Sequence, residues 1–223
     1  VHEYQKLNTL ANHQTVVRLL AKLEFVAGVG FAIAESIGVD GYLHVQEKLG
    51  ELVTQVESIK GLLVASEAQA APDENGTYWP ARVPLQTARN LGVRYYPRAL
   101  EILQLIGAGG FIQLPSVALE KNDIELQPLL QKYFRGAKIG ASERIRLSQL
   151  AWDLIGSQLA TRHELYERYY TGDPFRMYVF QYDTYDVEKL KNRVRDFQEF
   201  AANDGKEEYN HDHSGTTVPF PVK

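Results

Sequence analysis

The apolar residues in the first part of the chain recur every three or four positions, which is the period of an amphipathic helix. One run extends from Val16 to Ala34 and is followed by Gly38, a residue that favours the end of a helix. A second run extends from Leu49 to Ala71, where Pro72 ends it. The two runs predict long antiparallel helices joined by a short connection.

The remaining sequence is predicted to be mainly helical, with loops at its proline and glycine residues. An irregular loop is expected over Pro72–Pro84, with a turn at Glu74–Thr77. Further helices are expected over Leu85–Ile106, Ile124–Phe134 and Ser142–Tyr169. In the first of these, Pro97 either opens a new helix or kinks the old one. The last is expected to be capped by Ser142. Gly172-Asp173-Pro174 ends the last of these and starts another helix. Since no strand alternation or internal repeat is evident, the pattern predicts an all-α bundle with long up-and-down helices.

Composition indicates one globular domain followed by a tail. The chain has 223 residues, of which 44% are hydrophobic, enough for one large apolar core. Residues 1–202 are expected to form this domain and residues 203–223 a flexible tail, because the helical period is lost in a charged, polar stretch. The most apolar stretch, Phe25–Ala34, has roughly half the ~20 residues of a membrane span, so no membrane partner is expected. The chain begins with Val1 and has no signal-peptide pattern, so it is interpreted as part of a longer protein.

Charge and cysteine content exclude several classes of function. The formal net charge is -4, and the 24 basic residues are interspersed with 28 acidic ones, so the sequence has no basic face for nucleic acid. The chain contains no cysteine. Disulfides, thiol catalysis and cysteine-held iron–sulfur clusters are therefore excluded within it, and a cytoplasmic location is expected.

The histidines do not indicate a metal or catalytic site. His211-Asp212-His213 has neither helical spacing nor an apolar shell, so we interpret it as part of a solvated tail. His13, His44 and His163 have no serine or cysteine at a recognisable catalytic spacing, so each is expected to be a surface histidine or a satisfied buried one. No metal site is predicted.

A glycine cluster and one arginine are candidates for phosphate binding. The cluster Gly107–Gly110 has no strand before it, so it is not a dinucleotide motif. Its backbone N–H groups could bind a phosphate, with Gln104 one turn upstream, or the cluster could simply end a helix. Arg162 lies beside Thr161 within the strongest predicted helix, where its guanidinium could hold a phosphate bidentately. From the residues alone, an interhelical salt bridge is the favoured role of Arg162.

Several blocks of residues keep a characteristic order and spacing along the chain up to about Phe200. They are His13-Gln14 through Arg18, Ala21–Phe25, His44-Val45, Tyr96-Pro97-Arg98, the cluster Gly107–Gly110, Glu143–Leu147, Ala151–Leu154, Tyr166-Glu167-Arg168 and Gly172-Asp173-Pro174. In these blocks the chain resembles the 4-hydroxyphenylacetate hydroxylase family. The resemblance implies an acyl-CoA-dehydrogenase-like C-terminal helical bundle. The N-terminal helical domain and the middle β-domain of such proteins would be absent from this chain.

The resemblance also implies a function. Such enzymes use O2 to hydroxylate a phenol ortho to its hydroxyl group, through a flavin C4a-hydroperoxide, with reduced FAD supplied by a separate flavin reductase. The N-terminal part would hold most of the phenol site, so no catalytic residue is expected in this chain, and the bundle would build a homotetramer. FAD contacts are expected from Leu159, Ala160, Thr161 and Arg162, although many relatives have an aromatic residue, glycine and serine at the first three positions. Gln104, Gly109 and Gly110 resemble a motif that approaches the FAD of a neighbouring subunit.

Two alternative functions are considered. A flavoprotein like the 4-hydroxybutyryl-CoA dehydratases would share the bundle, but it needs an iron–sulfur cluster held partly by a cysteine near His13. The segment here is Arg18-Leu19-Leu20-Ala21, and the chain has no cysteine, which disfavours this alternative. The other alternative is a non-catalytic helical assembly domain. The sequence does not distinguish 4-hydroxyphenylacetate from other phenols as the substrate.

Overall fold

The computed structural model describes residues 2–115 and 124–208. The chain forms two compact units, Val1–Gln181 and Tyr182–Lys223. Residues 209–223, which include His211 and His213, lie outside the described residues. The predicted domain boundary at residue 202 and the flexibility of the predicted tail therefore remain predictions.

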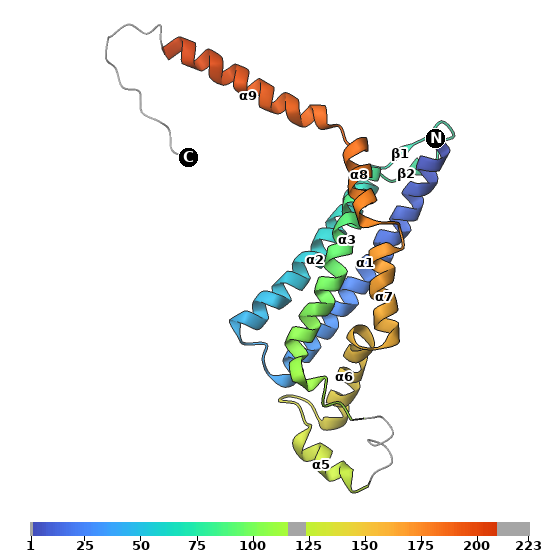
Figure 1. Cartoon of the computed structure of the whole chain (residues 1–223), viewed down its shortest axis with the longest axis vertical. Helices are drawn as coiled ribbons and strands as arrows, with labels where there is room; N and C mark the ends of the chain where they lie inside the picture. Colours follow the sequence, from blue (N-terminus) through green and yellow to red (C-terminus); the bar gives the residue numbers. More distant parts are fainter. Residues whose placement is uncertain (1, 116–123, 209–223) are drawn as a thin grey trace. The chain divides into compact units, whose positions relative to one another are not determined.

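Three long helices form the body of the first unit: α1 (His2–Ile37), α2 (Leu43–Ala68) and α3 (Arg82–Gly107). They pack side by side, each against the other two (Figure 1). The apolar periodicity predicted all three, although α1 begins well before Val16. Helix α3 continues through Pro97, so no new helix begins there. The predicted all-α bundle with long helices is confirmed.

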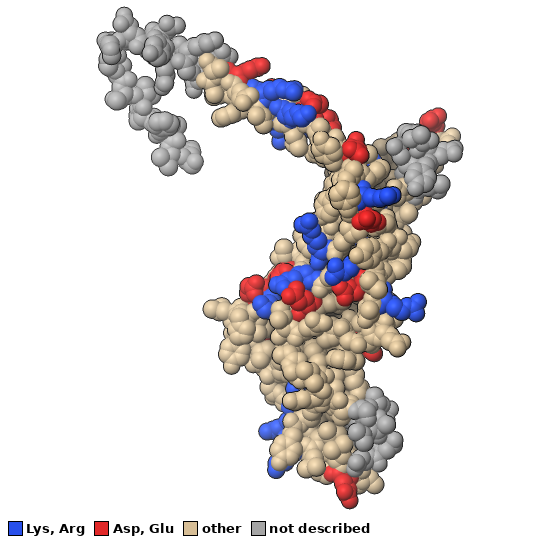
Figure 2. Space-filling model, in the orientation of Figure 1, with Lys and Arg blue, Asp and Glu red and all other residues tan. Residues whose placement is uncertain are grey.

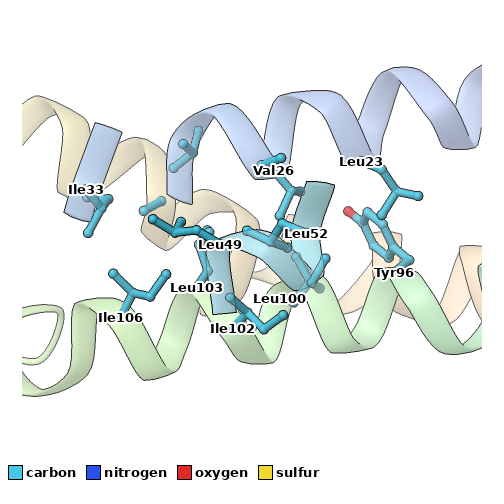
Figure 3. Close-up of a cluster of buried hydrophobic side chains, with 14 of the residues drawn as sticks. Leu23, Val26, Ile33, Leu49, Leu52, Tyr96, Leu100, Ile102, Leu103 and Ile106 are labelled. Carbon is cyan, nitrogen blue, oxygen red and sulfur yellow. The ribbon is translucent and has the colours of Figure 1, made fainter. Parts of the chain in front are cut away.

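The core lies where the apolar faces of these three helices meet (Figure 3). It includes Leu23, Val26 and Ile33 from α1, Leu49 and Leu52 from α2, and Tyr96, Leu100, Ile102, Leu103 and Ile106 from α3. A Cβ atom at Gly30 would lie 3.0 Å from Leu52 Cδ1. Gly30 therefore allows α1 and α2 to approach closely.

The end of α1 has a glycine C-cap. Gly38 has φ +76°, its N–H donates to Glu35 O at 3.1 Å, and the N–H of Val39 donates to Ala34 O at 3.0 Å. Glycine adopts this left-handed conformation without the steric cost that a Cβ atom would add. The predicted helix end at Gly38 is confirmed.

A short β-hairpin follows α2. Strands β1 (Ala71–Pro72) and β2 (Tyr78–Trp79) pair antiparallel, and the turn predicted at residues 74–77 lies between them. Asp73 stabilises the turn, because its Oδ1 accepts from the N–H of Asn75 at 2.9 Å and its Oδ2 accepts from Trp79 Nε1 at 2.9 Å. No strand alternation is evident in the sequence here, because strands of two residues are too short to show an alternating pattern.

The second half of the unit contains shorter elements. These are the 3-10 helix η1 (Ala108–Gly110), the helices α5 (Leu126–Tyr133), α6 (Ala141–Ile155) and α7 (Gln158–Tyr169), and most of α8 (Pro174–Thr184), which extends past Gln181 into the second unit. Helix α5 confirms the element expected over Ile124–Phe134, and α8 begins at Pro174 as predicted. Ser142 is not the cap of α6. The N-cap is Gly140, whose extended backbone precedes the first helical residue.

The predicted helix over residues 142–169 is wrong in one respect, because it breaks at Gly156 and Ser157. The N–H groups of both residues donate to Trp152 O, at 2.8 and 3.2 Å, and close α6. Ser157 then caps α7, since its Oγ accepts from the N–H of Ala160 at 3.1 Å. Arg162 consequently lies near the start of α7 rather than deep inside a long helix.

The second unit contains helix α9 (Val187–Glu208), which runs past residue 202. Its large apolar side chains Leu190, Val194, Phe197 and Phe200 are all exposed. Their spacing of three or four residues places them along one side of the helix. Among the described residues, no helix combines the length and apolar character needed to cross a membrane.

Candidate functional site

A groove of about 570 Å³ lies between α1 and α7. It is lined by Arg18 and Lys22 from α1 and by Leu159, Arg162, His163 and Tyr166 from α7. Two of the four residues in the predicted FAD-contacting segment, Leu159 and Arg162, therefore lie on its wall.

The other two residues of that segment do not line the groove. Ala160 is buried against the bundle, and its N–H bonds to the Ser157 cap. The hydroxyl of Thr161 donates to Ser157 O at 3.3 Å, one turn earlier. Side-chain contacts to a ligand are thus expected from Leu159 and Arg162, whereas Ala160 and Thr161 contribute to the first turn of α7.

The α1 wall is organised by a buried carboxylate. The side chain of Glu167 is 3% exposed and accepts from Arg18 Nε at 3.2 Å, from Arg18 Nη2 at 3.3 Å and from Lys22 Nζ at 2.6 Å. Its contact with Arg18 is bidentate, which fixes the plane of the guanidinium. One carboxylate is shared by two cations, so the cluster keeps a net positive charge.

Aromatic rings hold Arg18 from another direction. Its guanidinium carbon lies 4.5 Å from the centroid of the Tyr166 ring and 4.9 Å from that of Tyr170, and these two rings stack on each other. Arg18 Nη1 also donates to the Tyr166 hydroxyl at 3.0 Å. Cation–π contacts of this kind favour a fixed orientation of Arg18 at the edge of the groove.

Arg162 has a different environment. Its side chain is exposed, and it forms no ion pair with any carboxylate among residues 8–115 and 124–202, whose side chains the structure describes. The interhelical salt bridge that the residues alone favoured is therefore not formed by the described part of the chain. The nearby acidic residue Glu164 instead pairs with Arg168, at 2.6 Å. Arg162 therefore lines the groove without an ion pair to any described carboxylate.

His163 completes the wall as a polar but weakly basic group. Partial burial lowers the pKa of its imidazole from the ordinary value, and the charges of Lys22 and Arg162 lower it further against the opposing effect of Glu167. The ring is thus mainly neutral at pH 7 and can donate or accept a hydrogen bond. The groove offers three cations, one neutral imidazole and one shared carboxylate, a set suited to an anion such as a phosphate.

The second set of predicted residues lies elsewhere in the unit. Gln104 lines a separate groove of about 380 Å³, and the other residues lining that groove are Arg94, Pro97, Arg98, Leu100, Glu101, Glu164 and Arg168. Charged side chains of both signs gather over α2 and α3 on the face shown in Figure 2. Here Arg98 donates to both carboxylate oxygens of Glu51, each at 2.8 Å. This mixed groove is less suited to an anion than the α1–α7 groove.

Gly109 and Gly110 lie in η1, directly after α3. A Cβ atom at Gly109 would meet no atom of the described chain within 4 Å, and one at Gly110 would lie 3.7 Å from Arg144 Nη2. The backbone at Gly109 is therefore open to an approaching group. Within this chain, neither glycine lines the α1–α7 groove with Arg162.

Arg18, Lys22 and Glu167 were not predicted as site residues. The only available sequence signal was the spacing of four between Arg18 and Lys22, which places both on one face of a helix. Glu167 is 145 residues from Lys22, so their contact depends on the tertiary fold. Of the other histidines, His13 Nε2 lies 2.8 Å from Glu67 Oε1 and His44 stacks on Tyr42. No group of three metal-ligating side chains is found in the described part of the chain.

Comparison with known proteins gives consistent matches. The family model described as HpaB, 4-hydroxyphenylacetate 3-hydroxylase C terminal, matches residues 1–199. The chain is 44% identical over 191 residues to the 4-hydroxyphenylacetate 3-monooxygenase oxygenase component of Thermus thermophilus, covering 86% of this chain and 39% of that protein. It is 39% identical over 185 residues to a probable 4-hydroxyphenylacetate 3-monooxygenase of Bacillus subtilis, covering 83% and 38%. The chain thus spans about two fifths of the length of these relatives.

Solved structures agree with this match. The oxygenase component (HpaB) of 4-hydroxyphenylacetate 3-monooxygenase, complexed with FAD and 4-hydroxyphenylacetate, superposes with a TM-score of 0.84 at 41% identity. The match covers 89% of this chain and 41% of that one. An archaeal 4-hydroxybutyryl-CoA dehydratase superposes with a TM-score of 0.78 at 21% identity, over 87% of this chain and 39% of that one. The second likeness shows the fold alone.

Proposed function

Because the chain belongs to the family of the 4-hydroxyphenylacetate 3-hydroxylase C-terminal domain, we propose that it is the helical, FAD-binding part of an aromatic monooxygenase. The observation that carries the proposal is the cationic groove between α1 and α7, which contains the predicted FAD contact Arg162. A solved relative with the same fold is described as complexed with FAD. The reaction would be ortho-hydroxylation of a phenol with O2.

The residues of the groove fit the phosphate-bearing part of FAD. Arg162 has no ion pair in the described chain, and its planar guanidinium can contact two phosphate oxygens at once. Leu159 would contribute an apolar contact at the same wall. Ala160 and Thr161 would form part of the first turn of α7. When bound, the reduced flavin would supply the oxygen-activating chemistry, and this chain would bind and orient it.

The remaining partners belong to the same proposal. We expect the phenol to be held mainly by an N-terminal part and reduced FAD to come from a separate flavin reductase, in the cytoplasm. A homotetramer is supported by large apolar side chains left exposed on the long helices, since Phe25 is 50%, Phe31 44% and Val64 56% exposed. In a tetramer, Gln104, Gly109 and Gly110 would face the FAD of a neighbouring subunit.

No observation favours the alternatives over this function. A 4-hydroxybutyryl-CoA dehydratase-like activity would need cysteine ligands, and this chain has no cysteine. A non-catalytic assembly domain would not need Arg162, which has no ion pair among the side chains that the structure describes, to line a groove. Two relatives that are 44% and 39% identical to this chain over the aligned residues are named as a monooxygenase component and a probable monooxygenase.

The proposal is tested by a product assay. The protein at its full natural length is mixed with chemically reduced FAD, O2 and 4-hydroxyphenylacetate, and dihydroxylated product is measured. Product is expected from this protein, whereas the isolated 223-residue chain should give only hydrogen peroxide, because it lacks a complete pocket that excludes water. Absence of any hydroxylated phenol from the full-length protein over a panel of phenols would refute the function. Product from the isolated chain would refute the proposed division of the active site.

A further inference from the structure

We propose that Arg18 and Lys22 of α1 bind the pyrophosphate of FAD together with Arg162 of α7, and that Glu167 holds the α1 pair in position. This inference rests on the proposed function and adds a second wall to its cofactor site. Arg18 and Lys22 are then cofactor-binding residues, and Glu167, which would not touch the cofactor, is a positioning residue.

The first argument is geometric. A spacing of four residues places Arg18 and Lys22 one turn apart on the same face of α1, and both line the groove opposite Arg162. Their side chains are 20% and 21% exposed, so each keeps access to the groove although its stem is packed. A diphosphate in the groove would therefore meet cations from two helices.

The second argument concerns unused donors. Arg18 donates from Nε and Nη2 to Glu167 and from Nη1 to Tyr166, but each Nη carries two hydrogens. Lys22 Nζ carries three hydrogens, of which its bond to Glu167 uses one. Both side chains are thus fixed by contacts inside the protein while N–H groups remain for a ligand. Such a prearranged pair binds an anion with little further loss of side-chain freedom.

The third argument is the charge of the cluster. Arg18, Lys22 and Arg162 face a single carboxylate, Glu167, which is almost fully buried. If the only role of Glu167 were to form an ion pair between α1 and α7, one cation would be enough to neutralise it. Two cations, Arg18 and Lys22, contact it. The excess positive charge lies at the groove, where the two negative charges of a pyrophosphate would compensate it.

A purely structural role for Lys22 predicts something different. If Lys22 only tied α1 to α7 through Glu167, its removal would lower stability and would affect every flavin alike. If it contacts the pyrophosphate, its removal weakens FAD and leaves riboflavin, which has no phosphate, unaffected. Comparison of these two flavins separates the roles.

The experiment uses the protein at its full natural length. Reduced FAD and reduced riboflavin are titrated anaerobically into wild type, Lys22→Met, Arg162→Ala and the control Lys60→Met. Lys60 is an exposed lysine of α2 that pairs with Glu57 at 3.2 Å, away from the groove. We expect Lys22→Met to weaken reduced FAD about tenfold, the effect of one charge-assisted contact, with riboflavin and the control unchanged.

Each other outcome overturns the inference in a recognisable way. If Arg162→Ala weakens FAD and Lys22→Met does not, the α1 wall is not part of the site, while the proposed function stands. If Lys22→Met weakens both flavins equally, Lys22 acts through the fold. If neither variant changes FAD affinity, the groove is not the FAD site at all. Should Lys22→Met fail to fold, Lys22→Gln, whose amide can still donate to Glu167, gives the same comparison.

Discussion

Replacement of Glu167 by glutamine is expected to destabilise the bundle because it removes the shared partner of two cations. The carboxylate is 3% exposed and accepts three hydrogen bonds, from Arg18 at 3.2 and 3.3 Å and from Lys22 at 2.6 Å. Glutamine keeps one acceptor oxygen but loses the charge and places an amide N–H₂ beside a guanidinium or an ammonium group. The α1–α7 contact would lose most of its electrostatic component.

The size of the effect follows from the exposure of the partners. Breaking a fully buried ion pair costs about 3–5 kcal/mol, because the remaining charge stays away from water. Here Arg18 and Lys22 are about one fifth exposed and can regain water, so the loss is closer to that of one charge-assisted bond, about 1.5–3 kcal/mol. For a chain of this size, that corresponds to about 3–12 °C in melting temperature.

The assay is thermal and urea unfolding of the 223-residue chain at pH 7, with Glu67→Gln as the matched control. Glu67 also pairs with a basic side chain, His13 at 2.8 Å, but it is 53% exposed, so its replacement should change stability by less than about 0.5 kcal/mol. If Glu167→Gln unfolds within about 0.5 kcal/mol of wild type, or no lower than Glu67→Gln, the buried carboxylate does not organise this wall.

Two further predictions concern α3 and its end. Burial, together with the negative charges of Glu167 and Glu164, raises the pKa of Tyr96 to about 12. Between about pH 10 and 12, the unfolded chain therefore loses the phenol proton and the folded protein keeps it, so the wild type becomes less stable as the pH rises. Since two pKa units correspond to about 2.7 kcal/mol, urea unfolding across this range should show wild type losing roughly 2–3 kcal/mol more than Tyr96→Phe, and equal slopes would contradict the burial argument. Ala108 has φ +43°, which a Cβ atom makes costly, so Ala108→Gly should raise stability by about 1 kcal/mol in the same assay, and a loss of stability would contradict the strain.

The long helices could be predicted from the sequence because each buries one continuous stripe. Apolar residues such as Leu23 and Leu52 recur at the helical period, and the local stop at Gly38 has a local cause, its positive φ. The break between α6 and α7 could not be predicted from the period, because Leu154 and Leu159 continue the stripe across it. Only Gly156, the C-cap of α6, and Ser157, the N-cap of α7, mark the break, and the apolar period gives no sign of either cap.

The site could be predicted only in part. Arg162 came from a resemblance in its segment, and the structure places it on a groove with its charge unpaired in the described chain. The α1 wall depends on contacts between Arg18 or Lys22 and Glu167 across 149 and 145 residues. Such contacts have no local sequence signal, because they arise only when α7 packs beside α1. Residues that a fold brings together from distant segments are therefore the ones that pattern analysis misses.

The most direct test of the account is the affinity of reduced FAD for Arg162→Ala. Wild type and variant, both at full natural length, are titrated anaerobically with reduced FAD, and each is also melted thermally. Loss of one charge-assisted contact, worth roughly 1.5–3 kcal/mol, should weaken reduced FAD by about ten- to a hundredfold, with an unchanged melting temperature. Equal dissociation constants, or a lower melting temperature with unaltered FAD affinity, would contradict the account of the α1–α7 groove as a flavin site.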